Sequence, residues 1–267
     1  MTAGMDVASI GLLEETLRKT MASRSGAALD RALADLGWAE MLSEDPDLAI
    51  PLVFRLLGET GAHASVLNDV ILETIGGLPG GTPPMPYAGG RWMIWERDER
   101  EDNPVLGGLP LRQVPGGELM RVGEARRALG GWLIGSARAM LHLARDHALA
   151  RAQFGKPIAS FQAVRHRLAE TLVAIEGAEA TLTVPVTESP DLAFMLAKAA
   201  AGKAALTAAK HCQQVLGGLG FTAEHDLHRH IERVLVLDGL LGSARELTRR
   251  AGGGLRARRS APRLVQL

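Results

Sequence analysis

Two short motifs carry side chains and backbone groups suited to an anionic ligand. The first, RAQFGKP, contains Arg151, Gln153 and Phe154 beside a Gly-Lys-Pro turn. The second, QVLGGLGF, offers an amide side chain and backbone without Cβ atoms, at Gln214, Gly217, Gly218 and Gly220. Arginine presents a rigid fork of donors to a phosphate, and glycines let backbone N–H groups approach a ligand closely. Each motif alone is a common feature of helix ends, so a site requires elements that bring the two together.

Helical patterns surround both motifs. One apolar stripe has spacings of 3, 4, 4 and 3 and consists of Phe161, Val164, Leu168, Leu172 and Ile175. The run TESPDLAF predicts a helix start with the Ser189 side chain as cap, Pro190 at the first helical position and Asp191 near the positive end of the dipole. We expect helices over roughly 119–150, 160–182, 190–216 and 224–250. They predict a C-terminal four-helix bundle over 118–250, whose antiparallel neighbours can bring helix ends together.

The remaining segments predict a mainly α fold. Residues 1–75 form an N-terminal helical region with two or three helices. Residues 76–117 are dense in glycine and proline and leave only RWMIW and LPLRQV as candidate strands, too little for an independent sheet domain. Residues 251–267 are basic and glycine-rich, which predicts a flexible tail.

Composition bounds the partners. The 30 basic and 30 acidic residues give a formal net charge of +0, so no overall field attracts nucleic acid or an anionic membrane. The single cysteine, Cys212, cannot form an internal disulfide and reads as a small buried apolar residue. We see no run typical of a signal peptide or of a membrane span, and expect a cytoplasmic protein.

Taken together, the two motifs resemble the acyl-CoA dehydrogenase family, with the second motif about sixty residues after the first. The resemblance covers roughly 118–250 well and 28–75 loosely. It implies an N-terminal helical domain, a middle β-domain, a four-helix domain, FAD as cofactor and a fatty acyl-CoA thioester as substrate. By resemblance, the seven residues of the two motifs hold the ADP half of the FAD of a neighbouring subunit. An oligomer and an electron-transfer flavoprotein or similar acceptor are implied as partners.

The family chemistry also needs a carboxylate that removes the α-proton of the thioester. Family members often place a Glu-Gly pair about ten residues past an arginine, and in RHIERVLVLDG, which begins at Arg229, the pair becomes Asp238-Gly239. The resemblance therefore implies Asp238 as the catalytic residue, although it is one methylene short. A carboxylate displaced by about 1 Å can lose about a hundredfold in rate. Nitroalkane oxidases, relatives of this family, are similar in having Asp as base.

A second position for the base is the first bundle helix, as in other relatives. The family spacing from Gly135 leads to Ala125, with Glu124 beside it. Neighbouring helical residues point about 100° apart, so Glu124 is a poor substitute.

Two departures from the family pattern concern the chain's own flavin. Leu240, Leu241 and Gly242 follow the Asp-Gly pair, where the family usually has Thr or Ser and then an acidic or amide residue that touch the flavin. The middle β-domain is largely deleted within 76–117. The chain thus keeps residues that reach a partner's flavin and lacks most of those that would hold its own.

Three histidines, His225, His228 and His230, have a spacing that can bind zinc. They lie at an expected exposed helix start capped by Thr222, which favours a solvated, charged turn. We therefore expect no metal site.

Two functions remain open. The chain is either a subunit that takes part in acyl-CoA α,β-desaturation, or a non-catalytic structural partner of a full-length acyl-CoA dehydrogenase. A divergent flavoenzyme with Asp as base is a further alternative. The assembly is accordingly a homodimer, or a heterotetramer with a full-length dehydrogenase.

Overall fold

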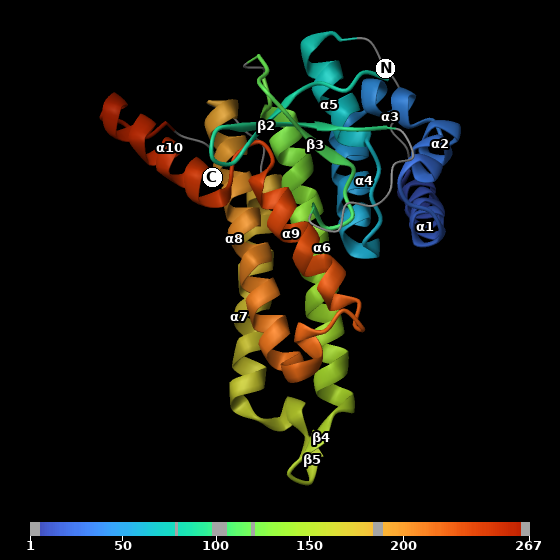
Figure 1. Cartoon of the computed structure of the whole chain (residues 1–267), viewed down its shortest axis with the longest axis vertical. Helices are drawn as coiled ribbons and strands as arrows, with labels where there is room; N and C mark the ends of the chain where they lie inside the picture. Colours follow the sequence, from blue (N-terminus) through green and yellow to red (C-terminus); the bar gives the residue numbers. More distant parts are fainter. Residues whose placement is uncertain (1–5, 78–79, 98–105, 119–120, 184–188, 263–267) are drawn as a thin grey trace.

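The structure is a computed structural model that describes residues 6–77, 80–97, 106–118, 121–183 and 189–262. The N-terminal part consists of short helices: α1 (Val7–Ser23), α2 (Ala27–Asp35), α3 (Trp38–Glu44), α4 (Pro46–Thr60) and α5 (Val66–Ile75). The C-terminal part consists mainly of long helices: α6 (Gly123–Ala150), α7 (Gln162–Thr183), α8 (Pro190–Leu216), α9 (Leu227–Gly239) and α10 (Ala244–Arg258). Figure 1 shows α6, α7 and α8 running along the long axis of the molecule, with the N-terminal helices at one side of α6.

A small antiparallel sheet lies between the two helical parts in the sequence. Its order is β1 (Met85–Tyr87), β2 (Arg91–Trp95) and β3 (Leu111–Val114), with Met93 of β2 paired to both neighbours. The two expected strands, RWMIW and LPLRQV, are therefore confirmed. β1 was not expected, because its MPY sequence lies among prolines.

The sheet joins the helical core through aromatic rings. Trp95 is fully buried and its ring centroid lies 5.5 Å from that of Trp132 on α6, which in turn lies 5.8 Å from Phe54 on α4. The three rings tie the sheet to both helical parts.

The expected bundle is present, but its fourth helix is broken. The predicted helix over 224–250 is α9 followed by α10, and the chain turns between them with Leu241 at φ 57° and Gly242 at φ 98°. Ser243 then forms a capping box with Glu246 and restarts the helix. α10 runs to Arg258, so it extends eight residues into the segment expected to be a flexible tail.

Three local predictions were wrong. Leu172 is 43% exposed, and Thr171 is buried in its place, bonded to His211 Nδ1 at 2.9 Å. Ser189 occupies the N-cap position of α8 but lies at φ 51°, and its side chain makes no capping bond within the described residues. Thr222 ends the short helix η3 (Gly217–Phe221), and Asp226 occupies the N-cap position of α9.

Helix α8 is the interior helix of the bundle. The stretch Pro190–Phe221 is long and apolar enough to cross a membrane by length and composition. Its alanines are buried between the neighbouring helices: Ala197, Ala199, Ala201, Ala204, Ala205, Ala208 and Ala209. The apolar character of α8 therefore serves close helix packing.

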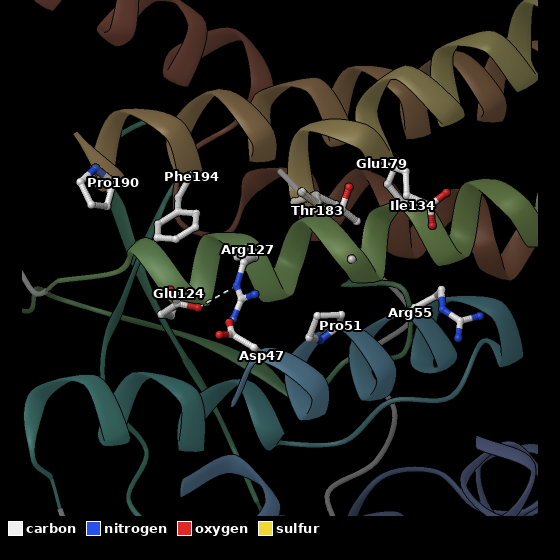
Figure 2. A pocket seen from close by; sticks show the side chains of 12 residues that line it. Asp47, Pro51, Arg55, Glu124, Arg127, Ile134, Glu179, Thr183, Pro190 and Phe194 are labelled. Carbon is white, nitrogen blue, oxygen red and sulfur yellow. Dashed lines mark hydrogen bonds and ion pairs between the residues drawn. The ribbon is translucent and has the colours of Figure 1, made fainter. Parts of the chain in front are cut away.

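A groove of about 790 Å³ runs beside α6, between α4 on one side and the facing ends of α7 and α8 on the other (Figure 2). Arg127 joins α6 to α4 through an ion pair with Asp47 at 3.0 Å, and it also pairs with Glu124 of its own helix at 2.8 Å. Pro51 and Phe194 line the groove from opposite sides.

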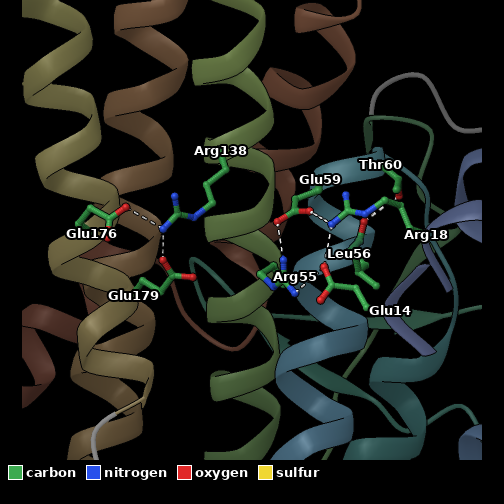
Figure 3. Close-up of polar contacts among 9 residues, drawn as sticks. All are labelled: Glu14, Arg18, Arg55, Leu56, Glu59, Thr60, Arg138, Glu176 and Glu179. Atoms are coloured by element: carbon green, nitrogen blue, oxygen red, sulfur yellow. Dashed lines mark hydrogen bonds and ion pairs between the residues drawn. The ribbon is translucent and has the colours of Figure 1, made fainter. Parts of the chain in front are cut away.

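Ion pairs fix the outer helices to this framework (Figure 3). Arg18 of α1 pairs with Glu59 of α4 at 2.8 Å. Arg138 of α6 contacts both Glu176 and Glu179 of α7. α4 and α6 approach so closely that a Cβ on Gly135 would overlap the carbonyl of Arg55.

Candidate functional site

The first motif forms a small hairpin at the end of α6. Arg151 is the C-cap residue of α6, and its backbone N–H donates to the His147 carbonyl at 2.8 Å. Two short strands, β4 (Ala152–Gln153) and β5 (Lys156–Pro157), follow. Phe154 is 91% exposed at φ 54° at the turn, with its edge against Phe161. The motif is thus presented outward on a rigid turn.

The second motif forms η3 at the end of α8. Gln214 is exposed, and a Cβ on Gly217 or Gly218 would meet nothing within 4 Å. A Cβ on Gly220, by contrast, would lie 2.6 Å from the Gln213 carbonyl oxygen. Gly217 and Gly218 therefore leave open backbone that a ligand can approach, whereas Gly220 is required by the packing of the turn itself.

Electrostatic contacts place the two motifs at the same end of the bundle. Burial lowers the pKa of His147, and the charges of His225 and Arg151 lower it further. His225 follows η3, so the segment after the glycine turn lies within electrostatic range of the end of α6. Figure 1 shows the β4–β5 hairpin projecting beyond this end.

The residues at this end fit the ADP half of FAD. Arg151 is exposed and forms no ion pair with the described residues, so its fork of donors remains available. Gly217 and Gly218 leave the backbone open at the same end of the bundle. Leu149, Phe154 and Phe221 are also exposed here, at 59%, 91% and 68%. Such apolar exposure is typical of a surface that another chain or a ligand covers.

Asp238, the predicted base, is buried and bonded to neighbouring elements. It lies near the end of α9 and is 8% exposed. Its Oδ1 accepts a hydrogen bond from the Ala244 N–H at 3.1 Å and lies 3.9 Å from Lys198 Nζ. A Cβ on Gly202 of α8 would overlap this same oxygen. The carboxylate is thus enclosed between α8 and the start of α10.

The backbone around Asp238 is closed by other parts of the chain. Lys198 Nζ donates to the carbonyls of Asp238 at 2.5 Å and Gly242 at 2.6 Å. The N–H of Leu241 donates to the Pro86 carbonyl at 2.7 Å, and its carbonyl accepts from Arg126 Nε at 3.1 Å. We call residues 238–242 the corner.

The β1 strand covers the corner. The Ala88 N–H donates to the Gly239 carbonyl at 2.8 Å, and the Tyr87 ring packs so tightly over Gly239 that a Cβ would overlap it. Asp238 lines neither the groove of Figure 2 nor two further cavities among the described residues. Glu124, the other carboxylate considered, lines the groove of Figure 2 and is paired with Arg127.

Sequence reasoning missed Lys198 and Arg126, which hold the corner. Lys198 is fully buried, and burial lowers its pKa to about 8. The signal was a single lysine on the apolar side of the alanine-rich run MLAKAAAGKAAL. Arg126 gave no signal, because it stands among other charged residues at a helix start.

The prediction for Cys212 is confirmed, whereas that for the three histidines is confirmed only in part. Cys212 is fully buried and its pKa is raised to about 12 by burial, which confirms the apolar packing role. His228 is partly exposed and bonded to Glu232 at 2.9 Å. His230 corrects the prediction of a solvated turn, because it is 4% exposed and burial lowers its pKa to about 4. Among the described residues no three His, Cys, Asp or Glu side chains gather as metal ligands.

Comparisons with known proteins agree with the motifs. A family model for the C-terminal domain of acyl-CoA dehydrogenases matches residues 119–251. Acyl-CoA dehydrogenase FadE34 of Mycobacterium tuberculosis is 34% identical over 208 residues, which are 70% of this chain and 29% of FadE34. The chain belongs to the acyl-CoA dehydrogenase family. Acyl-CoA dehydrogenase IpdE2 of the same organism is 39% identical over 117 residues, 44% of this chain and 37% of IpdE2. The chain therefore matches only about a third of the length of these relatives.

Solved structures share the fold of this family member. The ChsE4–ChsE5 complex from Mycobacterium tuberculosis aligns with a TM-score of 0.70 at 19% identity, over 98% of this chain and 100% of that chain. A variant of the Tcur3481–Tcur3483 steroid ACAD aligns with a TM-score of 0.71 at 18% identity, over 95% and 99%. The acyl-CoA dehydrogenase-like helical fold is thus confirmed, with three short strands in the segment where the middle β-domain was expected to be largely deleted.

Proposed function

We propose that this chain is a subunit of an FAD-dependent acyl-CoA dehydrogenase that contributes to a flavin site across a subunit interface, while a partner subunit supplies the catalytic base. The observation that carries the proposal is the enclosure of Asp238 by Lys198, Ala244 and Gly202. A base must reach the α-carbon of the thioester, and a carboxylate that is 8% exposed and bonded between two helices is poorly placed for this.

The open end of the bundle supports the flavin part of the proposal. FAD, when bound, accepts the hydride that leaves the β-carbon of the acyl-CoA. This chain would hold only the ADP half, with the Arg151 fork on the phosphates and the backbone of Gly217 and Gly218 beside them. Gln153, Phe154 and Gln214 are exposed at the same end and complete the proposed contact.

The assembly is part of the proposal. The solved ChsE4–ChsE5 structure, which shares the fold, is a complex of two proteins. It is a precedent for a hetero-oligomer. We propose a heterotetramer with a full-length acyl-CoA dehydrogenase over a homodimer, because both copies of a homodimer would carry the enclosed Asp238. An electron-transfer flavoprotein or similar acceptor, and a cytoplasmic location, complete the proposed setting.

The flavin site is tested by Arg151→Ala in a complex with a co-expressed full-length dehydrogenase subunit. Loss of charged hydrogen bonds to a phosphate costs about 1.5–3 kcal/mol, which is a tenfold to hundredfold loss of FAD affinity. The matched control is Arg145→Ala. Arg145 is an exposed arginine earlier on α6, and it pairs with Asp146. Equal flavin content in the two purified complexes would remove the ADP role of this chain.

The location of the base is tested by Asp238→Asn in the same complex. The amide keeps an oxygen that can accept from the Ala244 N–H but cannot take up a proton. Stopped-flow reduction of the flavin by acyl-CoA should remain within about threefold of the unmodified complex. A loss of about a hundredfold or more would favour the second candidate, a flavoenzyme in which Asp238 is the base.

A further inference from the structure

A cavity of about 450 Å³ lies beside the corner and has no role in the proposed function. Tyr87, Met195 and Leu247 give it an apolar wall. Arginine side chains also line it, from the start of α6 and from α10: Arg121, Arg126 and Arg250. The cavity therefore combines an apolar surface with guanidinium groups that converge from different elements.

Arg126 is the decisive side chain. It is 7% exposed, and its Nε donates a hydrogen bond to the Leu241 carbonyl at 3.1 Å. Within the described part of the chain no carboxylate lies within ion-pair distance of it. Its two terminal amino groups are thus left for whatever enters the cavity. A buried cation without a charged partner is costly, and a ligand that supplies the missing charge removes that cost.

The two carboxylates at the cavity leave Arg126 unneutralised. Glu246 is committed to Ser243 in the capping box of α10 and accepts from the Gly89 N–H at 2.9 Å. Asp191 is exposed, and although its charge raises the pKa of Arg126, burial and the charge of Arg250 outweigh it and lower this pKa to about 10. Three arginines and two carboxylates line the cavity, so its lining carries a net positive charge.

We propose that this cavity binds the oxyanion group of a small, otherwise apolar molecule, with the terminal amino groups of Arg126 on the anion and Arg121 and Arg250 at its entrance. A carboxylate and a phosphate monoester share this chemistry, and both match the planar donor fork of arginine. The apolar wall accepts the rest of the molecule. The site is distinct from the ADP contact at the opposite end of the bundle and requires neither flavin nor a partner subunit.

The test uses three probes with the same six-carbon tail: sodium hexanoate, hexyl phosphate and neutral 1-hexanol. Isothermal titration calorimetry on the full chain should give saturable binding of at least one anionic probe with a Kd below about 1 mM, and no saturable binding of 1-hexanol. If hexanoate binds and hexyl phosphate does not, the natural ligand carries a carboxylate. If only hexyl phosphate binds, the ligand is a phosphate ester. Equal binding of all three probes, or binding of none, would overturn the proposal.

Variants locate the site. Arg250→Gln removes a charge at the entrance and should weaken the anionic probe about threefold to tenfold. Arg249→Gln, one residue earlier on the same exposed helix and outside the cavity, is the matched control and should leave the Kd unchanged. Arg126→Lys keeps a cation but loses the fork, and should weaken binding tenfold or more. If Arg126→Lys does not fold, the Arg250 and Arg249 pair still decides, and equal Kd values in that pair would contradict the assignment.

Discussion

Lys198 Nζ lies 2.5 Å from the backbone oxygen of Asp238 and 3.9 Å from its carboxylate Oδ1, so one fully buried amine holds both the backbone and the side chain of the corner. The same amine reaches the Gly242 carbonyl at 2.6 Å. α9 and α10 are therefore joined through a side chain of α8, and the carboxylate predicted as a base is a structural partner of that lysine.

The buried lysine predicts a rise of stability with pH. Burial lowers the pKa of Lys198 from 10.5 to about 8, so between these values the unfolded chain binds more protons than the folded chain. The free energy of unfolding should then increase from about pH 8 to 10.5, by up to about 3 kcal/mol from this group. Urea unfolding of the unmodified chain and of Lys198→Met at several pH values checks this. If the free energy of unfolding rises with pH equally in both proteins, Lys198 is not the source of the rise.

Gly202 predicts a steric limit at the same place. In Gly202→Ala the new Cβ would overlap Asp238 Oδ1 and lie 3.1 Å from the Ala244 Cβ. We expect a loss of about 1–3 kcal/mol from overpacking. Gly177→Ala on α7 is the control, because its Cβ would meet nothing within 4 Å and should gain about 0.4–1 kcal/mol. Thermal unfolding measures the stability of both variants relative to the unmodified chain. If Gly202→Ala is as stable as the unmodified chain, the corner shifts to accommodate the new Cβ and the steric limit does not exist.

Two glycines of the second motif, Gly218 and Gly220, should respond differently to substitution by alanine. Gly218→Ala adds a Cβ into open space, so its thermal unfolding should stay close to that of the parent, whereas flavin retention in the complex should fall. Gly220→Ala places a Cβ 2.6 Å from the Gln213 carbonyl and should destabilise the fold by about 1–3 kcal/mol. Unfolding and flavin content of the two variants are measured in parallel. Normal flavin retention in Gly218→Ala would exclude a close approach of the ligand at this position.

His230 predicts acid sensitivity. Burial lowers its pKa from 6.5 to about 4, so the stability present above pH 6.5 should be lost as the pH falls towards 4, by up to about 3 kcal/mol from this group. His230→Leu should remove this part of the pH dependence. His228→Leu, at a partly exposed position on the same helix, should retain it. Circular dichroism unfolding curves between pH 4 and 7 compare the three proteins.

The helices and the glycine turn at the end of α8 could be predicted from the sequence, because both depend on local pattern. Pro190 and Asp191 located the start of α8, and the glycines of the second motif marked the end of that helix. The break between α9 and α10 could not be predicted, since Leu240 and Leu241 continue an apolar run and the positive φ of Leu241 is imposed by distant partners.

The packing around Asp238 could not be predicted for the same reason. Its surroundings come from Lys198, Tyr87 and Arg126, which are far away in the sequence. A motif locates a carboxylate along the chain, but only the tertiary structure decides whether solvent and substrate can reach it.

The contact between β1 and the corner also bears on the order of folding. Next to this contact, the N–H of Gly89, just after β1, donates to Glu246 Oε1 on α10 at 2.9 Å, although the two residues are 157 positions apart. Closing so long a loop costs entropy before the contact returns any stabilisation, which slows the step. During synthesis the strand must wait until α10 has left the ribosome. The corner should therefore form last, after the N-terminal helices and the bundle have already packed.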